Sequence, residues 1–303
     1  MPRRENKPMN EFKNYHPIVN FLYFTAVISC AMLLMNPICL LTALACSFIY
    51  SIILNGKKAV KFNFLFLIPA LAAAALINPA FNHEGVTILA YLPSGNPLTL
   101  ESIVYGIAAA VMLVTVVCWF SCYNKVMTSD KFIYLFGRII PSLSLILSMT
   151  LRLVPRFKAQ LRVISQAQRC IGRDVSQGSV VKRIKNGISI ISIMITWALE
   201  NSIETADSMK SRGYGLPGRS AFSIFTFEKR DKIALIYIMA LCLYIAAGGA
   251  AGGLYFRYFP SMKMTELSKF TVSIFAAYFM LCIMPAAIEL WEVRRWKAIE
   301  SKI

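Results

Sequence analysis

Charged side chains are scarce in this sequence. Asp, Glu, Lys and Arg make up 16% of its 303 residues, against about 25% in an ordinary soluble domain, while hydrophobic residues make up 57%. A soluble globular fold is therefore excluded, and we predict an integral membrane protein that contacts a lipid bilayer. The net charge of +17 comes from basic residues in the gaps between apolar runs, which indicates membrane orientation and an anionic lipid surface, with no nucleic-acid partner.

Groups that carry catalysis or hold a cofactor are also scarce. Only two histidines occur, His16 and His83, and the eight cysteines show no CxxC or Cys/His ligand spacing, so we predict no metal site, no cofactor and no disulfide framework. The sequence has no Walker A motif and no GxSxG elbow. The apolar runs contain almost no ionisable side chains, and the closest case is Glu289 near the end of the last run, whereas an ion-coupled carrier usually keeps such groups at mid-depth. We therefore expect a protein without catalysis of its own.

Six apolar runs are long enough to cross a bilayer, which takes about 20 residues. Two of them share the uncharged stretch 14–55 and meet at Asn36-Pro37, which predicts a helical hairpin with its tip at Asn36. The other four runs cover residues 62–79, 103–122, 233–256 and 270–288. The predicted fold class is all-α, a polytopic membrane protein of about six transmembrane helices.

Basic residues decide the expected orientation. With six spans and both termini on one side, only Arg257, Lys263 and Lys269 among the basic residues fall on the opposite side. Because positive loops stay in the cytoplasm, the N- and C-termini are predicted to be cytoplasmic. The predicted division is four membrane helices in 1–122, a cytoplasmic or interfacial coupling region in 123–231, and two membrane helices with a basic tail in 232–303.

Glycines are closely spaced in the fifth apolar run. Gly248 with Gly252, and Gly249 with Gly253, form two overlapping GxxxG spacings that permit close approach of another helix. We favour packing inside this chain over an interface between subunits.

The coupling region contains a basic, mostly polar tract that holds two amphipathic helical patterns. The first has an apolar side made of Phe157, Leu161, Ile164 and Ile171, and an opposite polar side made of Arg162, Gln166, Arg169 and Arg173. The second has an apolar side made of Leu199, Ile203, Ala206 and Met209. Each pattern closes on a glycine, Gly172 or Gly213, which predicts a helix end there.

Two shorter apolar patches, 139–151 and 188–199, flank the basic tract. If both crossed the bilayer, the basic cluster between them would lie outside the cell, against the positive-inside tendency. We therefore predict interfacial or partly embedded helices that anchor a cytoplasmic platform.

Several motifs together resemble the transmembrane T component of energy-coupling factor (ECF) transporters. They are the Asn36-Pro37 hairpin tip, the tract Leu151-Arg152-Leu153-Val154-Pro155-Arg156, the tripeptide Ala167-Gln168-Arg169, and Ser211-Arg212-Gly213-Tyr214-Gly215. The resemblance covers most of the chain and is most specific over 136–215. It implies a non-catalytic scaffold in a bacterial plasma membrane, which joins two cytoplasmic ABC-type ATPases to a small membrane S component for uptake of a vitamin or a metal ion such as cobalt.

The resemblance also assigns residues. In that family two helices, each ending in an Ala-Arg-Gly-like triplet, dock into grooves of the ATPases. Ser211-Arg212-Gly213 matches one triplet, whereas Cys170-Ile171-Gly172 stands where the other is usual and lacks its arginine; Arg169 and Arg173 remain candidate substitutes. The apolar backs of the two helices imply a contact surface for the S component, formed by Phe157, Leu161, Ile164, Leu199 and Ile203.

Simpler roles are open for the same residues. An arginine fork at a helix end binds carboxylates or carbonyls across an interface, but a cation at that place is also favoured by the helix dipole. Arg169 and Arg173 suit a lipid headgroup as well as an ATPase. Two other functions compete: a membrane enzyme acting on lipid headgroups, for which Asp174, Glu200, Glu204 and Asp207 are the nearby carboxylates, and a stand-alone secondary carrier.

Overall fold

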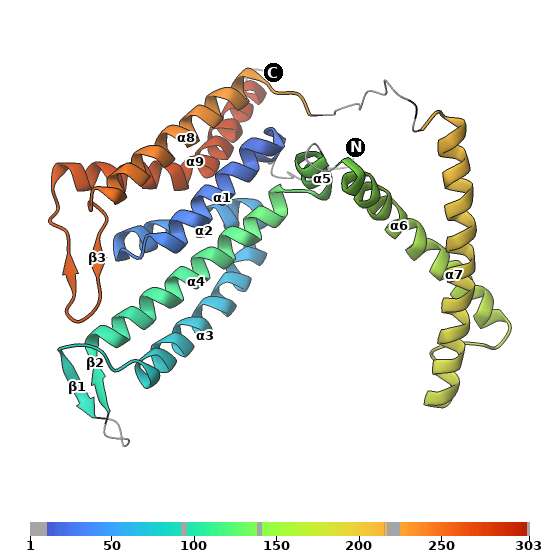
Figure 1. The fold of residues 1–303 in the computed structure, drawn as a ribbon, viewed down its shortest axis with the longest axis horizontal. Coiled ribbons are helices and arrows are strands. Elements are labelled where there is room, and N and C mark those ends of the chain that lie inside the picture. The colour runs from blue at the N-terminus through green and yellow to red at the C-terminus, as the bar shows by residue number, and fades with distance from the viewer. Residues whose placement is uncertain (1–10, 92–95, 138–140, 215, 217–224, 302–303) are drawn as a thin grey trace. The chain divides into compact units, whose positions relative to one another are not determined.

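The computed structural model describes residues 11–91, 96–137, 141–214, 216 and 225–301. These residues form helices and two short two-stranded sheets, and they divide into two compact units, 1–128 with 225–303 and 129–224 (Figure 1). The prediction of an all-α polytopic membrane protein is confirmed. Four helices of the described residues are long and apolar enough to cross a membrane: Pro37–Asn55, Leu100–Val126, Lys229–Ala250 and Lys269–Trp296.

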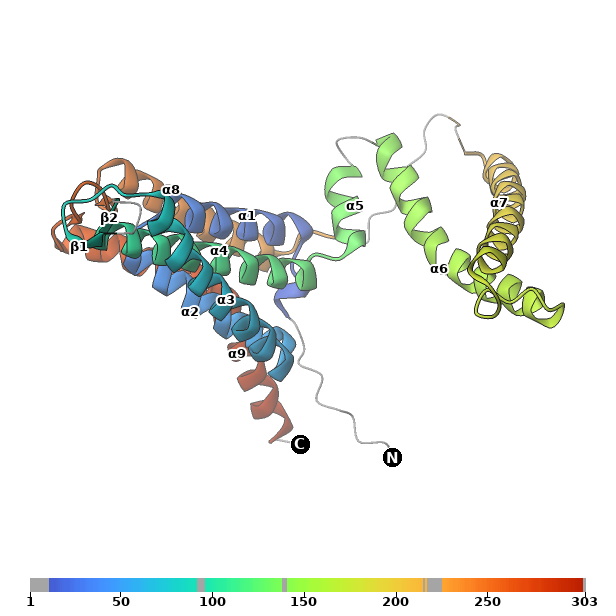
Figure 2. The same cartoon turned by 90° about the horizontal axis from the view of Figure 1, so that it is seen from below.

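The first unit is a bundle of long helices (Figure 2). Its helices are α1 (Pro17–Leu33), α2 (Pro37–Asn55), α3 (Lys57–Phe81), α4 (Leu100–Val126), α8 (Lys229–Ala250) and α9 (Lys269–Glu300). In the middle of the bundle α2 packs against both α4 and α9, so segments from the two ends of the chain share one core.

The hairpin predicted at Asn36 is confirmed. Helix α1 ends at Leu33, and α2 begins at Pro37 with Asn36 as its N-cap, where the Oδ1 of Asn36 accepts a hydrogen bond of 3.0 Å from the backbone N–H of Ile38. Proline is suited to this first helical position because its missing N–H would have no partner inside the helix. Helix α1 has 17 residues, a rise of about 25 Å, which is shorter than the hydrocarbon thickness of a typical bilayer.

Two short hairpins occupy loops between the helices. The loop between α3 and α4 contains β1 (Ile88–Tyr91) paired with β2 (Pro97–Thr99), and the loop after α8 contains β3 (Phe256–Arg257) paired with β4 (Lys263–Met264). Figure 1 shows both at the same end of the bundle, and the backbone N–H of Val86 donates to the carbonyl of Pro260 at 3.1 Å. The fifth apolar run was expected to be helical to Phe256, but α8 ends at Ala250 because Gly252 takes a left-handed φ of 79°.

Aromatic side chains fill the core of the bundle. Tyr23, Phe24, Tyr50 and Trp119 are buried and meet edge to face or tilted, and Phe12 inserts among them from the short 3-10 helix η1 (Phe12–Asn14). The carboxylate of Glu289 on α9 accepts hydrogen bonds from the backbone N–H groups of Glu11 and Phe12 at 3.1 and 3.2 Å. The chain before α1 is thereby tied to α9.

The glycines of the fifth run pack inside this chain. A Cβ atom added at Gly248 would lie 2.5 Å from Cδ1 of Ile274 on α9, and one added at Gly253 would lie 2.8 Å from the same atom. Ile274 is fully buried. The favoured interpretation, internal packing, is confirmed for these two glycines.

We expect Gly248→Ala to destabilise the bundle, because buried Ile274 would have to move. Overpacking of this kind typically costs about 1–3 kcal/mol. Gly249→Ala is the matched control: its nearest neighbour is Cδ1 of Leu254 at 4.0 Å, so it should not lower stability. Thermal unfolding of both variants in detergent checks the expectation, which fails if the two variants unfold at the same temperature.

Candidate functional site

The second unit consists of α5 (Ser129–Gly137), α6 (Pro141–Cys170) and α7 (Val180–Ser211). The short helix α5 was not predicted. Helices α6 and α7 are each continuous over 30 residues or more, so the apolar patches expected at 139–151 and 188–199 are parts of long helices. Residues 139 and 140 lie outside the described residues.

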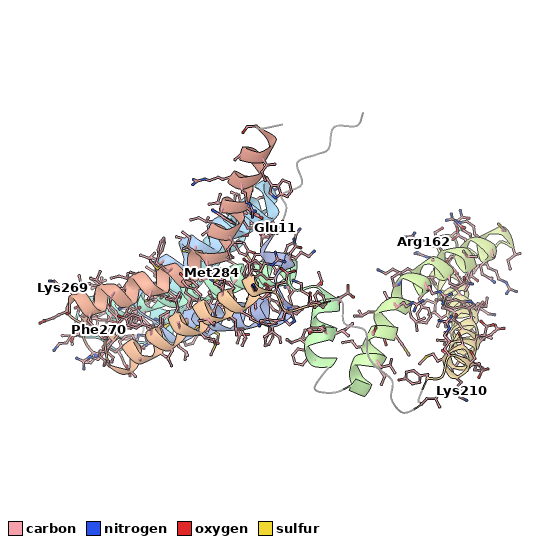
Figure 3. All side chains as sticks on the ribbon, turned by 90° about the horizontal axis from the view of Figure 1, so that it is seen from above. Glu11, Arg162, Lys210, Lys269, Phe270 and Met284 are labelled. Carbon is pink, nitrogen blue, oxygen red and sulfur yellow. The ribbon has the colours of Figure 1, made fainter. Side chains whose placement is uncertain are left out.

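Helices α6 and α7 contact each other through aromatic and aliphatic side chains. Phe157 of α6 and Trp197 of α7 meet edge to face, with ring centroids 5.5 Å apart, and Ile164 and Ile190 are buried. Beside this contact lies a cavity of about 340 Å³, lined among others by Leu161, Asp174 and Ile190. Figure 3 marks the two helices by Arg162 on α6 and Lys210 in the last turn of α7.

Both helices end in the same backbone geometry. Gly172 and Gly213 each have a φ of 76°. The N–H of Gly172 donates to the carbonyl of Arg169 at 3.0 Å, and the N–H of Arg173 donates to that of Gln168 at 2.9 Å. At α7 the corresponding bonds run from Gly213 to Lys210 at 2.9 Å and from Tyr214 to Met209 at 3.0 Å. These paired bonds define a Schellman motif, and the two glycine-closed ends predicted from the sequence are confirmed.

The shared geometry makes Ile171 and Arg212 equivalent. Each is the residue between the last helical residue and the left-handed glycine, and each is exposed. The sequence pattern placed Ile171 and Arg173 on the first helix, which is wrong: α6 ends at Cys170, because Gly172 turns the chain away two residues later. Cys170-Ile171-Gly172 and Ser211-Arg212-Gly213 are therefore matching helix ends.

Arg169, in the last turn of α6, binds side chains of the loop that follows this helix. Its Nε lies 3.0 Å from Oδ2 of Asp174, and its Nη2 lies 3.4 Å from Oγ of Ser176. Asp174 also accepts hydrogen bonds from the Ser176 hydroxyl at 2.7 Å and the Ser176 backbone N–H at 3.0 Å. These two bonds, with a smaller effect of Arg169, lower the pKa of Asp174 from the usual 3.8 to about 2. The sequence analysis named Asp174 only as a carboxylate near the basic tract; the Asp-x-Ser spacing after Gly172 signals the turn that it forms.

The loop is also fastened to the first turns of α7. The side-chain amide of Asn186 donates to the carbonyl of Asp174 at 2.9 Å, and Nε of Arg183 donates to the carbonyl of Val175 at 2.8 Å. We call residues 171–179 with these contacts the α6–α7 bracket. It holds the end of α6 beside the start of α7.

The predicted apolar surface is only partly available to a partner. Ile164 is 7% exposed and Phe157 is half-buried against Trp197, whereas Leu161, Leu199 and Ile203 are exposed. Leu199 and Ile203 continue a row on α7 that the sequence analysis missed, although its four-three-four spacing signals it. The other members of this outer row are Ile184, Ile188, Ile191 and Ile195, each more than half exposed.

The comparison with known proteins gives the family of this chain. The family model named CbiQ and described as "Cobalt transport protein" matches residues 9–224, more than half of the chain. The chain belongs to the CbiQ family. This membership confirms the resemblance to T components and covers the second unit, while α8 and α9 lie beyond the matched residues.

Curated relatives of this CbiQ-family chain carry the name energy-coupling factor transporter transmembrane protein EcfT. That of Lactobacillus helveticus is 33% identical over 103 residues, which is 34% of this chain and 37% of the relative. That of Lactococcus lactis is 29% identical over 105 residues, 34% of this chain and 40% of the relative. The chain thus spans about two fifths of the length of the curated relatives it matches.

Membership of the CbiQ family weighs against the two rival functions. Of the carboxylates named for the enzyme alternative, Glu200, Glu204 and Asp207 are exposed on α7. Glu289 is buried and caps the backbone of Glu11 and Phe12, so its carboxylate has a structural use that an ion-carrying group would have to give up.

The hydrogen bonds of the α6–α7 bracket should make its stability depend on the pH. Because folding lowers the pKa of Asp174, its hydrogen bonds stabilise the bracket above the usual value of 3.8, and this contribution is lost as the pH falls toward about 2. We expect Ser176→Ala to raise the pKa of Asp174 toward 3.8, because the hydroxyl bond has the largest effect. Ser179→Ala removes the N-cap of α7 without touching Asp174 and should leave this pKa unchanged.

The measurement is an NMR titration of the Asp174 carboxyl carbon in the labelled protein. An unchanged pKa in Ser176→Ala would show that the hydroxyl contact is not what holds the carboxylate ionised.

Proposed function

We propose that this chain is the coupling subunit of an ECF-type importer, which links two cytoplasmic ABC-type ATPase subunits to a substrate-binding S component in the membrane. The observation that carries the proposal is the pair of matching helix ends at Gly172 and Gly213. A glycine at this position ends the helix without a side chain and leaves room for another protein. The proposed docking residues are Arg169, Cys170, Ile171, Gly172, Arg173, Ser211, Arg212 and Gly213.

The separation of the two ends suits two binding sites. The α6 end is fastened near Asn186, and Arg212 follows 26 positions later on α7, a rise of about 40 Å. One compact patch on a partner does not span that distance, whereas two ATPase subunits side by side do. Closure of the ATPases on ATP would then move the two ends relative to each other, and this chain would need no catalytic group of its own.

The S component is proposed to rest on the apolar surface of the coupling helices. The outer row on α7 lies opposite Ile190 and Trp197, which face α6, so α7 is apolar on two sides. One side packs within the unit. The other, with Leu161 of α6, is the surface that we assign to the S component, together with the half-buried Phe157; Ile164 is left out because it is buried.

The proposed topology has six spans, formed by α1 to α4, α8 and α9, with both termini cytoplasmic in a bacterial plasma membrane. The asymmetry of basic residues supports it. A vitamin or a metal ion is the proposed class of substrate, in keeping with the description of the family as cobalt transport proteins.

Docking is tested by Arg212→Glu. Charge reversal at an exposed helix end should abolish co-purification of the ATPases in mild detergent while leaving membrane insertion intact, because a carboxylate repels the acidic or carbonyl groups that bind a guanidinium. Lys210→Glu is the matched control, with the same change of charge on another side of the last turn. Retained ATPases and uptake in Arg212→Glu would refute the docking role of Arg212.

The second contact is tested by Ile195→Glu on the outer row. The side chain is exposed, so the fold should tolerate the change, but a carboxylate in an apolar interface is costly and should release the S component while the ATPases stay bound. Thr196→Glu places the same charge on the neighbouring, polar side of α7. Co-elution of a small hydrophobic protein is measured, and equal retention by both variants contradicts the assignment.

A further inference from the structure

The two helix ends present different chemistry in the same geometry. We propose that Ile171 determines the specificity of the α6 end, docking into an apolar recess of one ATPase, while Arg212 docks into a polar recess of a second, different ATPase polypeptide. The inference rests on the proposed function. It adds that the two ends are not interchangeable and that their partners are not two copies of one chain.

Ile171 and Arg212 occupy equivalent positions at the two helix ends, so the difference between their side chains can be compared directly. A single exposed isoleucine on a protein surface normally needs no explanation. Ile171, however, is 63% exposed at the position that Arg212 occupies on α7, with the same pair of backbone hydrogen bonds and the same glycine φ after it. The two side chains therefore leave their helix ends in corresponding directions, one apolar and one cationic.

The apolar side chain is not used by its own helix end. A Schellman motif is often completed by an apolar contact between the residues at the two ends of its long hydrogen bond. At α6 these residues are Gln168 and Arg173, neither of them apolar. Ile171 is thus left on the surface of a polar loop, where its burial against a partner would be favourable.

Arg169 does not replace the arginine that the first triplet lacks, because its guanidinium group is bound within the α6–α7 bracket. Its guanidinium group would have to leave both Asp174 and Ser176 to reach a partner. Arg173 follows the left-handed Gly172, so its side chain departs after the turn and not from the position equivalent to Arg212. An arginine-binding recess is therefore a poor fit for the α6 end.

The surroundings of the two glycines also differ. A Cβ atom added at Gly213 would lie 3.1 Å from Cδ1 of Leu216, whereas one added at Gly172 would have no neighbour within 4 Å. The backbone beside Ile171 is open to close approach, while the end beside Arg212 is partly covered by its own chain. A recess shaped for one end does not match the other.

The test uses a photo-crosslinking amino acid placed at position 171 or at position 212 of the full chain, expressed in its native cells. Each crosslinked product is identified by mass spectrometry. We expect position 171 to crosslink to one ATPase polypeptide and position 212 to another. Crosslinking of both positions to the same polypeptide would overturn the inference and leave the proposed function standing, whereas no ATPase at either position would contradict both.

Substitutions provide the second measurement. Ile171→Arg should lower the amount of the ATPase bound at the α6 end about tenfold or more, because a charge enters an apolar recess. Ile171→Val should leave the amount of this bound ATPase unchanged. Equal retention by Ile171→Arg and wild type, or a gain on introducing the arginine, would show that the α6 end accepts the usual guanidinium and would refute the inference. Membrane insertion of each variant, followed by its yield in the membrane fraction, verifies that the chain is folded.

Discussion

The last carbonyl groups of a helix need hydrogen-bond partners, and this requirement determines the structure at the ends of α6 and α7. At the ends of α6 and α7 it is met by the backbone itself, through a left-handed glycine that lets the next two N–H groups turn back. Because the backbone satisfies itself, the side chains of Ile171 and Arg212 take no part in capping. They are left exposed and available to a partner.

The first N–H groups of a helix have the complementary need for acceptors, and this explains two buried carboxylates of the bundle. Asp231 accepts hydrogen bonds from the backbone N–H groups of His16 and Glu228, and Glu289 accepts from Glu11 and Phe12. Each acid satisfies donors at the start of a helical segment, and together they fasten the chain before α1 to α8 and α9. Ionisable groups in a membrane segment usually indicate transport, but these two have a structural explanation.

The two units divide the physical tasks. The bundle is held by aromatic packing around Trp119 and by the close contact of Gly248 with Ile274. The second unit has little buried surface of its own: α6 and α7 touch around Phe157 and Trp197, and the outer row on α7 stays exposed. A pair of helices with so much exposed apolar surface needs lipid or protein to cover it, which supports the proposed role as a coupling subunit.

Much of this could be predicted from the amino-acid sequence. Long apolar runs, the Asn36-Pro37 tip and the glycine stops depend on local properties, namely bilayer thickness, the fixed φ of proline and the freedom of glycine to take positive φ. Contacts between distant residues could not be predicted in this way. The sequence alone offered Arg169 and Arg173 as equal substitutes for the missing arginine, and it gave Asp174 no partner. Folding decided that Arg169 pairs with Asp174, that Ile171 stands where Arg212 stands on α7, and that Ile164 is buried, because these outcomes depend on where α6 ends and how it packs on α7.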